Sequence, residues 1–222
     1  YYKRAAALLP DDPAIRCSAA RVARAMENEA PMLSLKDSVE ARASLGREWL
    51  DYGYANRNSK YLKLALDEYG RAIARNPYHV DSLNDFAYAA YLWRLFNVSG
   101  DDIGVPIDPR VLAEAETYAR RAVALTARGQ DVRKRLEARS ALGEVLLAQD
   151  RAHEAVDELQ SALQDLASAR AGVEHAVFDE LRWDLRQAAL CAAIVDERTG
   201  FPQHAQSLRA IADDMIKTIK VS

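Results

Sequence analysis

Glycine and proline are both scarce in this 222-residue sequence, which contains nine and seven of them respectively. Together they make 16 of the 222 residues, whereas an average protein has about 12% of the two combined. These residues form the turns between strands, and runs of β-branched residues are missing as well. An all-β sandwich and a doubly wound α/β fold are therefore excluded.

Three further absences narrow the class of protein. No apolar stretch approaches the roughly 18 residues of a membrane-spanning helix, and the net charge of −3 argues against a nucleic-acid binder. The two cysteines, Cys17 and Cys191, are too few for a disulfide framework. Their apolar helical surroundings predict buried or half-buried free thiols, which suit a reducing compartment. We therefore expect a cytoplasmic protein, with the periplasm as the alternative.

Alanine is the most conspicuous residue that is present. The sequence contains 41 alanines, and alanine is the best helix former because it loses no side-chain entropy in a helix. The composition therefore predicts an all-α protein. Of the 30 basic residues, 23 are arginine, and together with the alanine content this favours a GC-rich bacterial genome as the source.

The segment 139–167 has the pattern of two helices joined by a short turn at 149–151. In the first helix, Leu142, Gly143 and Leu146 lie on one face. In the second helix, the apolar positions recur every three or four residues, as in a helix that packs on one side. These positions are Ala155, Leu159 and Ala162.

A second segment, 65–77, has the pattern of a helix with a clear end. Ala65, Tyr69, Ala72 and Pro77 form the pattern Ala-x3-Tyr-x2-Ala-x4-Pro. The residue before a proline is disfavoured in the α region, so Asn76 and Pro77 predict the end of a helix. Upstream, Leu45, Gly46 and Trp49 fit the first helix of the same hairpin.

Both patterns resemble the tetratricopeptide repeat, a 34-residue helix–turn–helix unit. Gly143 and Ala155 have the twelve-residue separation of that family, whereas Gly46 and Ala65 are nineteen apart. The resemblance thus implies a seven-residue insertion around 52–60, and a longer one through 97–110. It also implies an all-α, right-handed superhelical solenoid of antiparallel helix hairpins, with about ten helices in a single domain, 1–222. We assign repeat units to 39–78, 79–127, 135–168 and 174–219, and degenerate or capping helices to 1–38.

The sequence contains no pattern of catalytic or cofactor-binding residues. Phosphate-binding glycine loops, a Gly-x-Ser-x-Gly nucleophile motif and a His-Glu-x-x-His zinc motif are all missing. The four histidines are isolated in the sequence, without a second ligand at helical spacing; they are His79, His153, His175 and His204. We therefore expect no enzyme activity, no catalytic residue, no cofactor and no metal site.

In the tetratricopeptide family the first helix of each unit lines a concave groove. Carried onto this sequence, the resemblance implies a binding surface for a protein or peptide segment, and not for nucleic acid. The partner-binding residues that we predict are Arg47, Asn84, Tyr88, Tyr91 and Glu144. Tyrosine is a favoured contact residue at such surfaces. The family's binders of acidic chaperone tails are excluded, because Glu137 stands where they require a cation.

Our first functional hypothesis is a non-enzymatic scaffold that mediates protein–protein interaction. An alternative is a regulatory or sensor domain of a longer multidomain protein, because residues 2–10 resemble the tail of a repeat unit. In that alternative, the insertions at 52–60 and 97–110 would contact a neighbouring domain. A third hypothesis is homo-oligomerisation through an end helix.

Overall fold

The computed structural model describes residues 38–99, 107–129, 131–168 and 175–219. In this part of the chain all regular structure is helical, and the all-α prediction is confirmed. The helices predicted before residue 38 lie outside the described residues. The helices are α3 (Val39–Ala55), α4 (Ser59–Arg75), α5 (Val80–Ser99), α6 (Pro109–Thr126), α7 (Val132–Ala148), α8 (Ala152–Ser168), α9 (His175–Thr199) and α10 (Pro202–Ile219).

Side chains next to the helix ends explain several of these boundaries. Ser38 caps α3 by accepting a hydrogen bond from the backbone of Ala41, and Asp131 caps α7 by accepting one from Lys134. Such caps satisfy backbone N–H groups that have no partner in the first turn of a helix. The stop predicted at Asn76 and Pro77 is confirmed, because α4 ends at Arg75.

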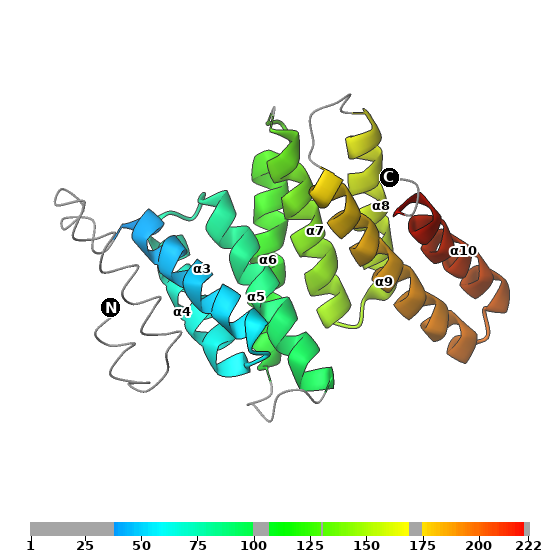
Figure 1. The fold of residues 1–222 in the computed structure, drawn as a ribbon, viewed down its shortest axis with the longest axis horizontal. Helices are drawn as coiled ribbons and strands as arrows, with labels where there is room; N and C mark the ends of the chain where they lie inside the picture. The colour runs from blue at the N-terminus through cyan, green and yellow to red at the C-terminus, as the bar shows by residue number, and fades with distance from the viewer. Residues whose placement is uncertain (1–37, 100–106, 130, 169–174, 220–222) are drawn as a thin grey trace.

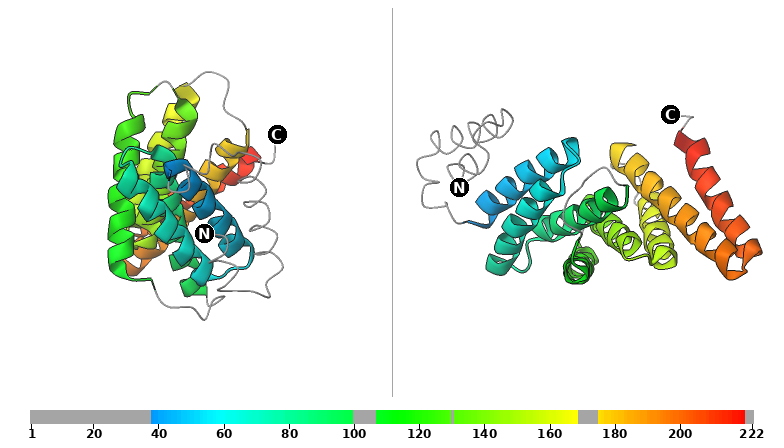
Figure 2. Two further views of the ribbon diagram at one scale, coloured as in Figure 1. Left: turned by 90° about the vertical axis from the view of Figure 1, so that its left-hand side faces the viewer. Right: turned by 90° about the horizontal axis from the view of Figure 1, so that it is seen from below.

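The helices follow one another in chain order along a bent row (Figures 1 and 2). Each helix packs against the next one, and α5 and α7 also pack against each other. The odd-numbered helices therefore form a connected row, since α3 contacts α5 and α7 contacts α9. Among the described residues, no two even-numbered helices make a comparable contact. This arrangement places the odd-numbered helices side by side on one surface.

Glycine allows the closest approach within two of the helix pairs. A β-carbon at Gly143 in α7 would lie 2.7 Å from Cγ of Leu159 in α8. A β-carbon at Gly46 in α3 would lie 2.6 Å from the ring of Tyr69 in α4. Both separations are far shorter than the usual 3.5–4.0 Å between carbon atoms. Each glycine therefore lets a large buried side chain of the second helix lie directly on the backbone of the first.

The insertion predicted around 52–60 is not a loop. Instead, α3 extends nine residues past Gly46, whereas α7 extends five past Gly143. Likewise, α4 begins ten residues before Tyr69, whereas α8 begins seven before Leu159. The seven additional residues are thus four in α3 and three in α4, or about one helical turn in each. These turns are stable because aromatic side chains pack across them, with the rings of Tyr52 and Tyr61 4.5 Å apart.

The turns of these two hairpins have the same form. Each contains three residues, 56–58 between α3 and α4 and 149–151 between α7 and α8. The middle residue has a left-handed backbone in both, with φ of 47° at Arg57 and 62° at Asp150. The predicted turn at 149–151 is confirmed.

An ion pair also recurs at equivalent positions of the two hairpins. Four residues before Gly46, Arg42 contacts Glu68 at 2.7 Å, and Glu68 immediately precedes Tyr69. Four residues before Gly143, Arg139 contacts Glu158 at 3.0 Å, and Glu158 immediately precedes Leu159. The two hairpins are therefore built on one plan, although they differ in length.

The burial predicted for the cysteines is wrong for Cys191, which is exposed. The buried stripe of α9 passes instead through two pairs of alanines four residues apart, 188 with 192 and 189 with 193. Position 191 lies beside that stripe and not on it. Cys17 lies outside the described residues.

Candidate functional site

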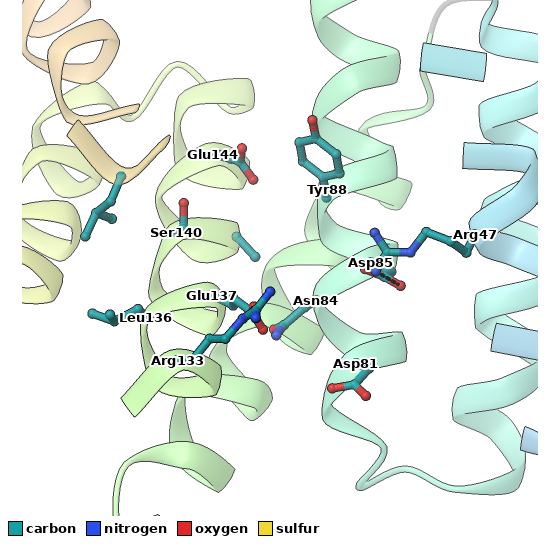
Figure 3. A pocket seen from close by; sticks show the side chains of 12 residues that line it. Arg47, Asp81, Asn84, Asp85, Tyr88, Arg133, Leu136, Glu137, Ser140 and Glu144 are labelled. Atoms are coloured by element: carbon teal, nitrogen blue, oxygen red, sulfur yellow. Dashed lines mark hydrogen bonds and ion pairs between the residues drawn. The ribbon is translucent and has the colours of Figure 1, made fainter. Parts of the chain in front are cut away.

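A hollow of about 310 Å³ lies between α5 and α7 (Figure 3). All of the residues that line it belong to odd-numbered helices, so it opens on the surface that these helices share. One residue comes from α3, four from α5, six from α7 and one from α9. They are Arg47; Asp81, Asn84, Asp85 and Tyr88; Arg133, Leu136, Glu137, Ser140, Ala141 and Glu144; and Leu181.

The structure brings four of the five predicted partner-binding residues to this hollow: Arg47, Asn84, Tyr88 and Glu144. Tyr91 is not among the lining residues. Its ring stacks on that of Tyr88, with the centroids 6.3 Å apart. Burial raises the pKa of the Tyr91 hydroxyl, and the negative charges of Glu144 and Asp184 raise it further. Tyr91 is thus partly buried beside the lining residue Tyr88 and is not itself a lining residue.

Arg47 and Asp85 form an ion pair at the α3 side of the hollow (Figure 3). Nη2 of Arg47 donates to both carboxylate oxygens of Asp85, at 2.7 and 2.8 Å. Burial raises the pKa of Asp85 to about 6, although the charge of Arg47 opposes this rise. The pair therefore holds α3 against α5 at the edge of the hollow, and its carboxylate is only partly compensated.

Further charge pairs join the walls of the hollow. Lys134 of α7 contacts Asp81 of α5 at 3.0 Å, and Arg133 contacts Glu137 within α7 at 2.8 Å. Ser140 donates a hydrogen bond of 2.7 Å to Asp184 of α9. These contacts fix the spacing of α5, α7 and α9, so the side chains around the hollow are already positioned.

Asn84 and Glu144 supply buried acceptors. The side-chain oxygen Oδ1 of Asn84 is buried and has no hydrogen-bond partner among the described residues. Glu144 is also buried, at the opposite end of the lining from Arg133 (Figure 3). An unsatisfied buried acceptor costs free energy, and a hydrogen-bond donor from a ligand would remove that cost. The hollow is thus suited to receive a group that donates hydrogen bonds.

Carboxylates outnumber guanidinium groups in the lining, and Lys134, which does not line the hollow, pairs with one of them, Asp81. The lining contains four carboxylates but only two guanidinium groups. Ser140 has Asp184 as its partner and no histidine, so it lacks the base that a catalytic serine requires.

Eight of the twelve lining residues were not among the predicted partner-binding residues, including Asp85 and Arg133. Helical spacing could have found both, because residues three or four apart share a face of a helix. Asp85 lies four residues after Asp81, and Arg133 lies four residues before Glu137.

The four histidines are isolated in the sequence, but the fold brings two of them to one carboxylate. The rings of His153 and His204 stack 5.6 Å apart, and both contact Asp196. Burial would raise the pKa of Asp196, but the hydrogen bonds with these two histidines lower it below its ordinary value. His79 contacts Ser82 instead, and the side chain of His175 lies outside the described residues.

Comparison with protein-family models and with curated proteins gives no match for this chain. In the described residues, no helix combines the length and the apolar character needed to cross a membrane.

Proposed function

We propose that this chain is a non-enzymatic helical-repeat scaffold, similar to the tetratricopeptide family, that binds a segment of another protein between α5 and α7. The observation that carries the proposal is that every lining residue of the hollow is on an odd-numbered helix. In a solenoid of helix hairpins, the first helices of successive hairpins form one continuous binding surface. The even-numbered helices would then form the outer layer.

The shared plan of two hairpins supports a repeat architecture. The pair α3–α4 and the pair α7–α8 share a glycine beneath a large side chain, a three-residue turn and an arginine–glutamate contact. Such a unit cannot bury its apolar face alone, so it requires a neighbour on each side. If the rest of the chain follows the same plan, the whole chain forms a right-handed superhelix of about ten helices.

The ligand that fits the hollow best is a peptide segment with lysine or arginine. The lining carries two more carboxylates than guanidinium groups, and such a field attracts and orients cations. Asn84 offers a buried acceptor, and the ring of Tyr88 offers an apolar and aromatic contact. A volume of about 310 Å³ is at the lower end for small-molecule sites, and it accommodates one or two side chains of a longer segment.

A peptide array of graded net charge tests this proposal. We expect the chain to retain peptides rich in lysine or arginine, and fluorescence anisotropy then gives the affinity of the best one. Tyr88→Ala and Asn84→Ala should each weaken that binding by about fivefold or more, as for a central contact residue. Tyr78→Ala is the matched control, because Tyr78 is 71% exposed and does not line the hollow.

The proposal fails if both hollow variants bind as tightly as the wild type while Leu125→Ala on α6 abolishes binding. Far-UV circular dichroism of each variant shows that the helices remain intact. Light scattering across a dilution series tests the homo-oligomerisation alternative, for which the mass should fall on dilution.

A further inference from the structure

Three helices bring two histidines onto one buried carboxylate. The side chain of Asp196 in α9 is only 7% exposed. Nε2 of His153, from α8, lies 3.0 Å from Oδ1 of Asp196. Nδ1 of His204, from α10, lies 2.5 Å from Oδ2. The two rings are nearly parallel, at 11°.

The local backbone explains why His204 returns to Asp196. Gly200 has a φ of 90°, the left-handed conformation that ends a helix and reverses the chain. The backbone N–H of Phe201 donates to the carbonyl of Asp196 at 2.8 Å, which closes this turn. Because α10 begins at Pro202, His204 lies in its first turn, directly over the last turn of α9. The contact is thus built into the α9–α10 connection.

His153 reaches the same carboxylate from another hairpin. It is in the first turn of α8, 43 residues before Asp196 in the sequence. Helices α8 and α9 pack against each other, and so do α9 and α10. The cluster therefore joins the predicted unit 135–168 to the predicted unit 174–219.

We propose that His153, Asp196 and His204 bind one divalent transition-metal ion, of which zinc is the best fit. Two imidazole nitrogens and one carboxylate oxygen are a ligand set found at zinc sites. The three ligand atoms lie within 4.8 Å of one another. Zinc bonds of about 2.0–2.2 Å require separations of roughly 3.3 Å between tetrahedral ligands. The ligand atoms that are farthest apart must therefore approach each other by up to about 1.5 Å, through rotation of the histidine rings.

The exposure of the ligands suits ion entry. The side chains of His153 and His204 are 43% and 59% exposed, so both rings can rotate and a solvent position remains open for a fourth ligand. The buried carboxylate supplies the negative charge that holds a cation. Imidazole ligands favour zinc, copper, nickel or cobalt over magnesium and calcium, which prefer oxygen ligands.

The proposal goes beyond peptide binding, because none of the three cluster residues lines the hollow. A bound ion would connect three helices of the last two hairpins. It would thereby stabilise the C-terminal end of the row through binding to the folded state alone.

Metal titration of the full chain tests the site. The protein should carry no histidine tag and be treated with a chelator beforehand, and zinc binding is then measured by isothermal titration calorimetry. We expect one zinc ion per chain and no binding of magnesium. Cobalt added in place of zinc should give the visible absorption of a tetrahedral complex.

Variants identify the ligands. His204→Gln and Asp196→Asn should each weaken zinc binding by about tenfold or more, since each removes a ligand atom. His79→Gln is the matched control, because it removes a histidine outside the cluster and should leave the affinity unchanged. His204 is mostly exposed, so its replacement leaves the fold intact even if Asp196→Asn unfolds.

Absence of zinc binding by the wild type would overturn the proposal. Equal affinities of wild type and His204→Gln would overturn it as well. Because the peptide assay of the hollow does not involve these residues, failure of one proposal is distinguishable from failure of the other.

Discussion

Replacing Gly143 by alanine tests how closely α7 and α8 pack. The new β-carbon would lie 2.7 Å from Cγ of Leu159 and 2.9 Å from its Cδ2. Leu159 is fully buried, so it has no solvent into which it can move. The helices must therefore separate, or the leucine must leave its preferred rotamer.

The expected loss of stability combines two opposing effects. Alanine inside a helix is about 1 kcal/mol more favourable than glycine. Overpacking of a filled core costs typically 1–3 kcal/mol. Gly70→Ala in α4 has the helix-propensity effect without overpacking, because its β-carbon would lie 3.8 Å from Phe86, which is ordinary contact. The difference between the two variants therefore measures the cost of overpacking. We expect Gly70→Ala to stabilise the protein, and Gly143→Ala to be less stable than Gly70→Ala by about 1–3 kcal/mol.

Urea unfolding followed by far-UV circular dichroism measures this difference. The free energy of unfolding comes from the midpoint and the slope of each curve. The double variant Gly143→Ala with Leu159→Ala should lose less than the sum of the two single variants, since the clash then has no partner. Equal stability of Gly143→Ala and Gly70→Ala would refute the packing argument.

Two further predictions concern pH and backbone conformation. The pKa of Asp85 is raised to about 6 by burial, so its contribution to stability is complete below about pH 4 and is lost as the pH rises through 6. Asp85→Asn should therefore gain up to about 3 kcal/mol relative to wild type between pH 4 and pH 7, and a difference independent of pH would contradict this. Gly200 has a φ of 90°, and a β-carbon added there would have no atom within 4 Å, so only backbone strain opposes a side chain at this position. Gly200→Ala should cost about 1 kcal/mol in urea unfolding, and Gly200→Asn should cost less because asparagine tolerates this conformation.

The helical class and several helix ends were predictable because they depend on neighbours within one turn. Alanine content favours helix at each position independently, and Asn76 with Pro77 stops α4 through a steric clash between adjacent residues. Gly143 was singled out by its twelve-residue separation from Ala155, which is that of the tetratricopeptide repeat, and the structure places it against Leu159.

The placement of the seven additional residues could not be predicted from spacing. Their number follows from the sequence, but a loop and two longer helices satisfy the same count. The choice depends on whether the extended turns find a surface to pack on. Here Trp49, Tyr52 and Tyr61 pack together across the two helices and make the extension stable.

Part of the candidate site was predictable from the sequence, and part was not. The resemblance to the tetratricopeptide repeat predicted Asn84 and Tyr88 as groove residues, and both line the hollow on α5. The partner of Arg47 was not predicted, because Asp85 is 38 residues away in the sequence. Tyr91 was predicted as a partner-binding residue; it is partly buried and stacks on Tyr88, and it is not among the lining residues.

The sequence by itself therefore determined the helical class, the ends of several helices and the residues that share each helix face. Only the tertiary structure decided which faces meet: the Arg47–Asp85 pair, the hollow between α5 and α7, and the cluster of His153 and His204 around Asp196. The physical reason is the distance along the chain over which each interaction acts. Propensity, capping and periodicity act over a few residues, whereas these contacts depend on how whole helices pack.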